Sequence, residues 1–91
     1  MTNEEALHKL EEALRKSNDI PGLYMFKFII PNENEKLARV MALFDDTSNI
    51  HSQESAKGKY VSVTSKEMML DVDSVIAKYK EALKINGLMI L

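Results

Sequence analysis

The sequence predicts an α+β fold of the ferredoxin-like class: a four-stranded antiparallel sheet with two helices on one face, preceded by an extra N-terminal helix. Three observations support it. β-prone runs and helical stripes follow one another in the order β-α-β-β-α-β. A hairpin signal, Lys57-Gly58, stands in the middle of this pattern. With 91 residues, the chain fits a single core.

The N-terminal segment is predicted to be an amphipathic helix that ends near Lys16. Thr2 and Glu5 have the spacing of a capping box. A leucine stripe then recurs at helical intervals, and its members are Leu7, Leu10 and Leu14. Residues 1–20 are therefore predicted as a helix and linker, and residues 21–91 as the ferredoxin-like domain.

The first strand is predicted over Leu23–Ile30, where the single charge, Lys27, identifies the solvent-facing side. The residues predicted to face the core are Tyr24, Phe26, Phe28 and Ile30. The residues predicted to face away from it are Leu23, Met25, Lys27 and Ile29.

The remaining elements follow from the same periodicities. The predicted helices are about Glu33–Phe44 and from Asp71 to a stop at Asn86-Gly87, with a loop at Asp45–Asn49. The predicted strands are Ile50–Ser55, Tyr60–Lys66 and Leu88–Leu91. In the strand that begins at Tyr60, Val61 and Val63 should face the core, while Tyr60, Ser62 and Thr64 face away.

Both central helices are expected on one sheet face, which leaves the other face as the candidate interaction surface. Its apolar side chains need a cover, and either the leucine stripe of the N-terminal helix or a second copy of the sheet would supply one. The candidate residues are Met25, Lys27, Lys57, Tyr60, Ser62, Thr64 and Met89. We expect a homodimer through this face or through the edge of the last strand, or an unknown protein partner.

Composition excludes several classes of function. The net charge of −2 gives no overall attraction to nucleic acid or anionic lipid, and the absence of cysteine removes thiolate sites. The N-terminal end is acidic and no apolar run is long enough to span a membrane, so we expect a cytoplasmic protein without a membrane partner. Nothing in the sequence indicates a cofactor or a metal site.

No nucleophile, base and oxyanion donor can be grouped from these residues, so the chain is not expected to be an enzyme. RNA-recognition domains share the predicted fold, and Lys57-Gly58-Lys59 keeps the basic opening of their third strand. Tyr60 is the only aromatic residue of that stretch, so nucleic acid is not the expected partner, and weak RNA binding is the second alternative function.

From Pro21 to Leu91 the chain resembles the YbeD-like family of small bacterial proteins of unknown function. The resemblance is carried by residues 55–64, supported by Phe26-Lys27-Phe28 and by Ile85–Leu91. It implies a ferredoxin-like fold, similarity to ACT-type regulatory domains and no assigned enzyme activity. The expected function is a non-catalytic regulatory or adaptor module that acts through protein contacts.

The run Leu37–Phe44, followed by Asn49-Ile50, is also similar to the first helix and next strand of an ACT domain. That similarity implies an alternative function, sensing of an amino acid or another small metabolite. The candidate ligand loop consists of Asn32, Glu33, Asn34 and Glu35. ACT domains place a glycine near this helix start, where the present chain has Asn34-Glu35.

Overall fold

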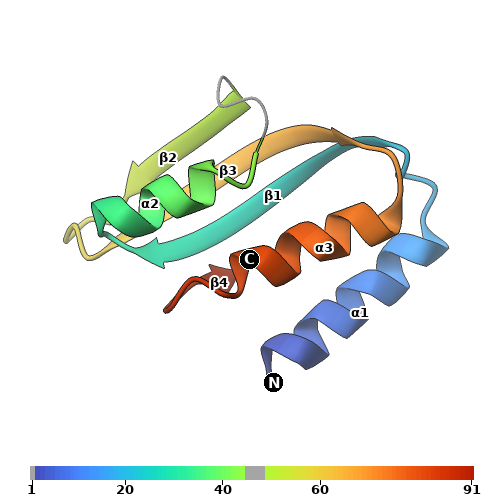
Figure 1. Cartoon of the computed structure of the whole chain (residues 1–91), viewed down its shortest axis with the longest axis horizontal. Helices are drawn as coiled ribbons and strands as arrows, with labels where there is room; N and C mark the ends of the chain where they lie inside the picture. Colours follow the sequence, from blue (N-terminus) through green and yellow to red (C-terminus); the bar gives the residue numbers. More distant parts are fainter. Residues whose placement is uncertain (1, 45–48) are drawn as a thin grey trace.

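In a computed structural model, the described residues are 2–44 and 49–91, and they contain three helices and four strands (Figure 1). The elements are α1 (Asn3–Lys16), β1 (Gly22–Pro31), α2 (Asn34–Met41), β2 (Ile50–Glu54), β3 (Tyr60–Met69), α3 (Val72–Ala82) and β4 (Met89–Ile90). None of these helices is both long and apolar enough to cross a membrane.

The strands form one antiparallel sheet in the order β2-β3-β1-β4. β3 pairs with β1 along its whole length, from Gly22 opposite Met69 to Pro31 opposite Tyr60. β4 pairs with β1 only at Phe28 and Ile29. The predicted α+β class with a four-stranded antiparallel sheet is confirmed.

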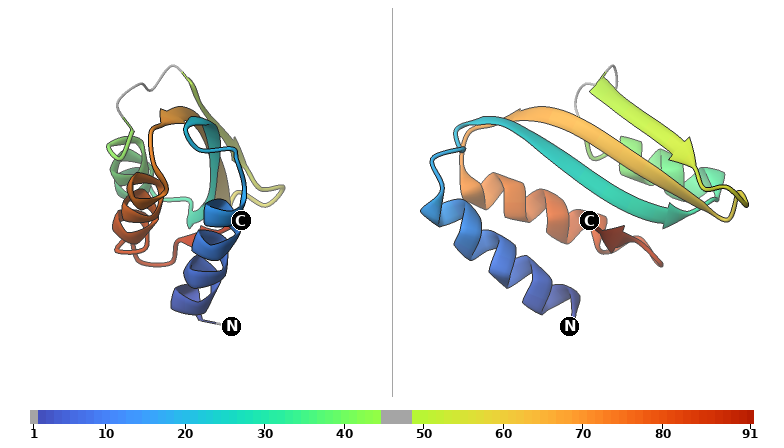
Figure 2. Two further views of the ribbon diagram at one scale, coloured as in Figure 1. Left: turned by 90° about the vertical axis from the view of Figure 1, so that its right-hand side faces the viewer. Right: turned by 180° about the vertical axis from the view of Figure 1, so that it is seen from behind.

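The core lies between the sheet and the pair of helices α2 and α3, which cover one face (Figure 2, left). Phe26, Phe28 and Ile30 of β1 are fully buried, as the alternation predicts. The ring of Phe26 lies 5.2 Å from that of Tyr79 on α3 and 5.4 Å from that of Phe44. Aromatic packing of this kind joins both helical segments to the central strand.

α1 packs at the edge of the sheet, beside α3, and leaves the solvent-facing side of the sheet uncovered (Figure 2). Thr2 caps the helix, because its hydroxyl accepts a hydrogen bond from the Glu5 N–H at 3.1 Å. Leu7 and Leu14 are buried in the common core, and Arg15 bonds to Asp73 of α3 at 2.6 Å. The leucine stripe of α1, one of the two covers predicted for the solvent-facing side of the sheet, therefore packs into the core and does not cover that side.

Several predicted boundaries are wrong. β3 continues to Met69 instead of ending at Lys66, because β1 offers it a partner along its whole length. α2 ends at Met41, before the predicted Phe44, and β4 contains only Met89 and Ile90. The loop predicted at Asp45–Asn49 lies outside the described residues except for Asn49.

α3 begins as predicted and ends early. The Asp71 carboxylate accepts from the Ser74 N–H at 2.7 Å. The Ser74 side chain first, and then this N–H, lower the pKa of Asp71. The helix ends at Ala82, and Ile85 then bonds three residues back to the Ala82 carbonyl. After this tighter turn, the Ile85 side chain is buried in the core.

Candidate functional site

The candidate site is the solvent-facing side of the sheet, which we call the open face. The strand register places on it every second residue of each strand. These residues are Leu23, Met25, Lys27, Ile29, Pro31, His51, Gln53, Tyr60, Ser62, Thr64, Lys66, Met68 and Met89. Figure 2 (right) views the molecule from this side.

The structure brings together most of the predicted surface residues and leaves one out. The register puts Met25, Lys27 and Met89 on the open face, and it puts Tyr60, Ser62 and Thr64 there as well. Lys57 lies in the turn between β2 and β3, beyond the end of the paired strands. Six of the seven predicted residues therefore share one face of the sheet, and Lys57 lies at its margin.

One side of the open face, formed by β1 and β4, is apolar apart from Lys27. Leu23 is 70% exposed and Met25 is 42% exposed, and Met89 and the neighbouring Leu91 are also exposed. Met68 extends the apolar side chains onto β3, where it lies opposite Leu23. Because these side chains lie on adjacent strands and not singly, they form a contiguous surface of the kind that partners bind.

The other side, formed by β2 and β3, is polar. His51 lies opposite Thr64, and Gln53 lies opposite Ser62, whose hydroxyl donates to the Gln53 carbonyl at 3.3 Å. Exposed Tyr60 borders a hollow of about 320 Å³ near the β2–β3 turn. This side therefore offers hydroxyl, amide and imidazole groups, which can form directional hydrogen bonds with a partner.

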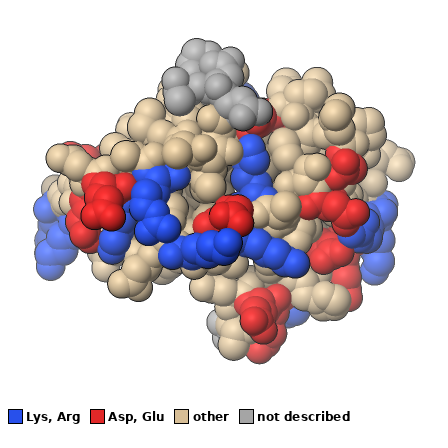
Figure 3. Space-filling model, in the orientation of Figure 1, with Lys and Arg blue, Asp and Glu red and all other residues tan. Residues whose placement is uncertain are grey.

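The charge of the open face is positive. Lys27 and Lys66 are exposed, diagonal neighbours on β1 and β3, and neither forms an ion pair within the described part of the chain. The register assigns no Asp or Glu to this face, although Glu54 lines the hollow at its margin. On the helix side, by contrast, acidic and basic groups alternate (Figure 3).

Several open-face residues were not predicted as site candidates, although Leu23 and Ile29 were already assigned to this side of β1. His51 and Gln53 follow from the period-two alternation of β2, which was a usable signal. Lys66 ends the predicted strand, and the same alternation assigns it to this side. Pro31 and Met68 lie beyond the predicted strands, so their place on this face required the pairing of β1 with β3.

The candidate ligand loop is held against the β2–β3 turn. The Asn32 side-chain amide donates to the Gly58 carbonyl at 2.8 Å, and its backbone N–H donates to the Lys59 carbonyl at 2.9 Å.

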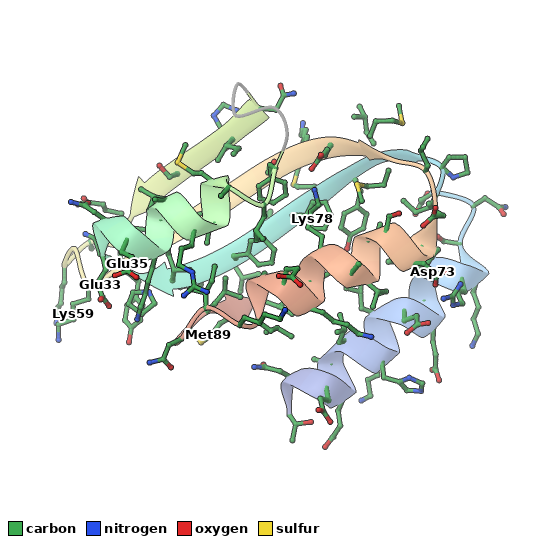
Figure 4. The ribbon with its side chains drawn as sticks, viewed as in Figure 1. Glu33, Glu35, Lys59, Asp73, Lys78 and Met89 are labelled. Atoms are coloured by element: carbon green, nitrogen blue, oxygen red, sulfur yellow. The ribbon has the colours of Figure 1, made fainter. Side chains whose placement is uncertain are left out.

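The rest of the candidate ligand loop leads into α2 and is acidic. Glu33 pairs with Lys36 at 3.0 Å, and Glu35 lies in the first turn of α2 (Figure 4). Exposed Asn34 begins that helix. Carboxylates here oppose an anionic ligand at the helix start.

Two polar contacts lie on the core side of the sheet. The hydroxyls of Tyr24 and Tyr79 lie 2.9 Å apart, and burial is the main cause that raises the pKa of Tyr79. Lys78 pairs with Glu67 at 3.0 Å and points between α3 and the strands (Figure 4). Within residues 2–44 and 49–91, no three His, Asp or Glu side chains are grouped to bind a metal ion.

Comparisons with protein-family models, with curated proteins and with solved structures found no significant match to this chain.

Proposed function

We propose that the chain is a non-catalytic adaptor or regulatory module that binds an acidic segment of a partner protein through its open face. One observation carries the proposal: exposed aliphatic side chains and two unpaired lysines share a face to which the register assigns no carboxylate. An acidic amphipathic helix matches both features. Its apolar side would cover the exposed methionines, and its carboxylates would pair with the lysines.

The open face favours such a partner over single-stranded nucleic acid. Bases bind by stacking on planar rings, and the register assigns only two of them to this face, Tyr60 and His51, four positions apart along β3 because His51 lies opposite Thr64. The apolar surface consists instead of leucine, isoleucine and methionine, which adapt to protein side chains. Weak RNA binding is accordingly a less well supported function.

An acidic partner also suits the face better than a second copy of the chain. In a face-to-face homodimer, Lys27 and Lys66 of each protomer would approach a facing sheet that is also positive and to which the register assigns no carboxylate. Like charges brought together in this way oppose association. The alternative of metabolite sensing has less support, because Asn32 holds the hairpin and Glu33 and Glu35 oppose anions.

We further propose that the fold is ferredoxin-like and that the chain is related to the YbeD-like family, with its similarity to ACT-type regulatory domains. Support comes from the position of β1 between β3 and β4, and from α2 and α3 each connecting two strands of the sheet. A regulatory role would agree with that relationship.

The test is a titration of ¹⁵N-labelled protein with a synthetic helical peptide that carries leucines at positions i, i+3, i+4 and i+7 and glutamates elsewhere. We expect amide shifts on the open face and a loss of affinity of about tenfold or more for Lys66→Glu and for Tyr60→Ala. Lys9→Glu is the matched control, because it makes the same charge change on exposed α1.

Three results would count against the proposal. The first is equal binding of a peptide in which lysine replaces every glutamate, and the second is an equal loss of affinity for Lys9→Glu. The third is tighter binding of a single-stranded oligouridine than of the acidic peptide, which would favour a nucleic-acid ligand.

A further inference from the structure

The edge of β1 next to β4 is only partly paired. β1 has ten residues, yet β4 pairs with Phe28 and Ile29 alone. The Lys27 carbonyl accepts from the Leu91 N–H at 3.1 Å on this side. Because backbone groups alternate in direction along a strand, Met25 and Leu23 point their N–H and C=O groups to the same side, where no strand among the described residues pairs with them.

A groove of about 320 Å³ lies along this edge. On the α1 side it is lined by Ala6, Leu7 and Leu10, and on the sheet side by Tyr24 and Met25 together with Lys27 and the last residues of the chain. Figure 2 (left) shows α1 below the edge of β1, in line with the sheet. The groove thus has the unpaired backbone groups of Met25 on one wall and the apolar side of α1 on the other, while Leu23 lies farther along the same edge of β1.

We propose that this groove binds an extended segment of a partner polypeptide, which adds to the sheet antiparallel to β1 and continues the direction of β4. Only a polypeptide backbone offers alternating donors and acceptors that match those of Leu23 and Met25. Alternate side chains of the bound strand would point to the core side of the sheet, where Tyr24 and Tyr79 line the groove, so apolar residues are expected at every second position.

The position of α1 distinguishes this occupant from a second copy of the chain. A strand must lie about 4.8 Å from β1 to pair with it. Because α1 forms the opposite wall of the groove, a single extended chain is the kind of strand that could lie there, whereas the edge of another complete sheet would meet α1 first. The edge is distinct from the proposed open-face function, because backbone groups, and not the lysines of the face, supply the recognition.

The test uses a peptide of alternating valine and threonine, about eight residues long, as the probe. Amide hydrogen exchange of the full chain is measured by NMR with and without it. We expect slower exchange specifically at the Leu23 and Met25 amides. A control peptide that is N-methylated at alternate residues keeps the side chains and loses the donors that face β1, so it should give no protection.

Substitutions in the groove supply the second arm of the test. Ala6→Met fills the groove from α1 and should weaken binding about tenfold or more. Ala13→Met is the matched control, since Ala13 is exposed on the same helix and does not line the groove. Lys66→Glu should leave binding unchanged, which separates this site from the open face.

Three results would overturn the inference. Equal binding of the N-methylated peptide would show that the groove takes apolar groups without strand pairing. Unchanged exchange at Leu23 and Met25 on saturation would place the peptide elsewhere. Protection that rises with protein concentration in the absence of peptide would identify a second copy as the occupant.

Discussion

At the scale of single residues, Ser65 departs most clearly from its surroundings. It is 1% exposed and is the only polar residue in the buried set of the described chain. It faces the core between Phe26 of β1 and Ile50 of β2, and its hydroxyl has no hydrogen-bond partner. An unpaired buried hydroxyl lowers stability, because its hydrogen bond to water is lost on folding and not replaced.

Ser65→Ala should therefore raise the free energy of unfolding, by about 1 kcal/mol. Chemical denaturation of the wild type and the variant measures the difference. Ser62→Ala is the control, because the Ser62 hydroxyl bonds to the Gln53 carbonyl and its removal should be neutral or slightly destabilising. A destabilised Ser65→Ala protein would contradict the expectation.

The buried Tyr79 hydroxyl predicts a dependence of stability on alkaline pH. Its pKa is raised above the ordinary 10.0, mainly by burial. Above that ordinary value the unfolded chain loses the Tyr79 proton and the folded chain keeps it, so stability is complete below pH 10.0 and falls as the pH rises further.

Tyr79→Phe should cost about 1 kcal/mol at neutral pH, because the hydrogen bond to Tyr24 is lost. The gap between wild type and variant should shrink above about pH 10. Urea denaturation across this range measures both effects, and Tyr60→Phe provides a comparison at an exposed tyrosine. A gap that stays constant with pH would contradict the expected linkage.

At the scale of elements, Lys78 ties α3 to its neighbours. Its ammonium group lies 3.0 Å from the Glu67 carboxylate on β3, donates to the Leu43 carbonyl at 2.8 Å after α2, and lies 5.0 Å from the centre of the Phe44 ring. Lys78 and Glu67 are each only 17% exposed. Three segments therefore meet at one partly buried cation.

Lys78→Ala should lower the free energy of unfolding by roughly 1–3 kcal/mol, because it leaves the Glu67 carboxylate half-buried without a cation. Lys80→Ala is the matched control on the exposed side of α3 and should have little effect. Thermal and chemical denaturation measure both changes. Equal stability of the two variants would show that the Lys78 contacts contribute nothing net.

At the scale of the whole molecule, charge is distributed unevenly. Six ion pairs within the described residues involve helices or the core side of the sheet, and none includes a residue of the open face. A net charge of −2 conceals this difference between the two sides. The composition alone therefore misrepresents what a partner approaching the sheet would encounter.

The sign of the salt dependence should reveal which partner the open face binds. Binding of the acidic helical peptide should weaken severalfold between about 0.01 M and 0.15 M salt, as attraction to Lys27 and Lys66 is screened. Self-association through the same face should instead strengthen, because repulsion is screened. Sedimentation velocity and calorimetry at both salt concentrations distinguish the two, and acidic-peptide binding that strengthens with salt would contradict the assignment.

The local pattern of residues was sufficient to predict the sides of the sheet. In β1 the single charge at Lys27 separates two sets of alternating side chains, and the structure buries the aromatic set and exposes the other. The candidate surface followed from this, apart from Lys57. Alternation depends only on the pleat of each strand, so it can be read without knowing the strand's neighbours.

Packing over long sequence distances decided the rest. The leucine stripe of α1 predicts a helix that must be covered, yet only the assembled core places it at the free edge of β1 and not on the open face. β3 gains residues 67–69, including Met68 on the open face, from pairing, and β4 is reduced to two residues. Periodicity identifies which side of an element is apolar, whereas the choice of what covers it depends on contacts among all elements at once.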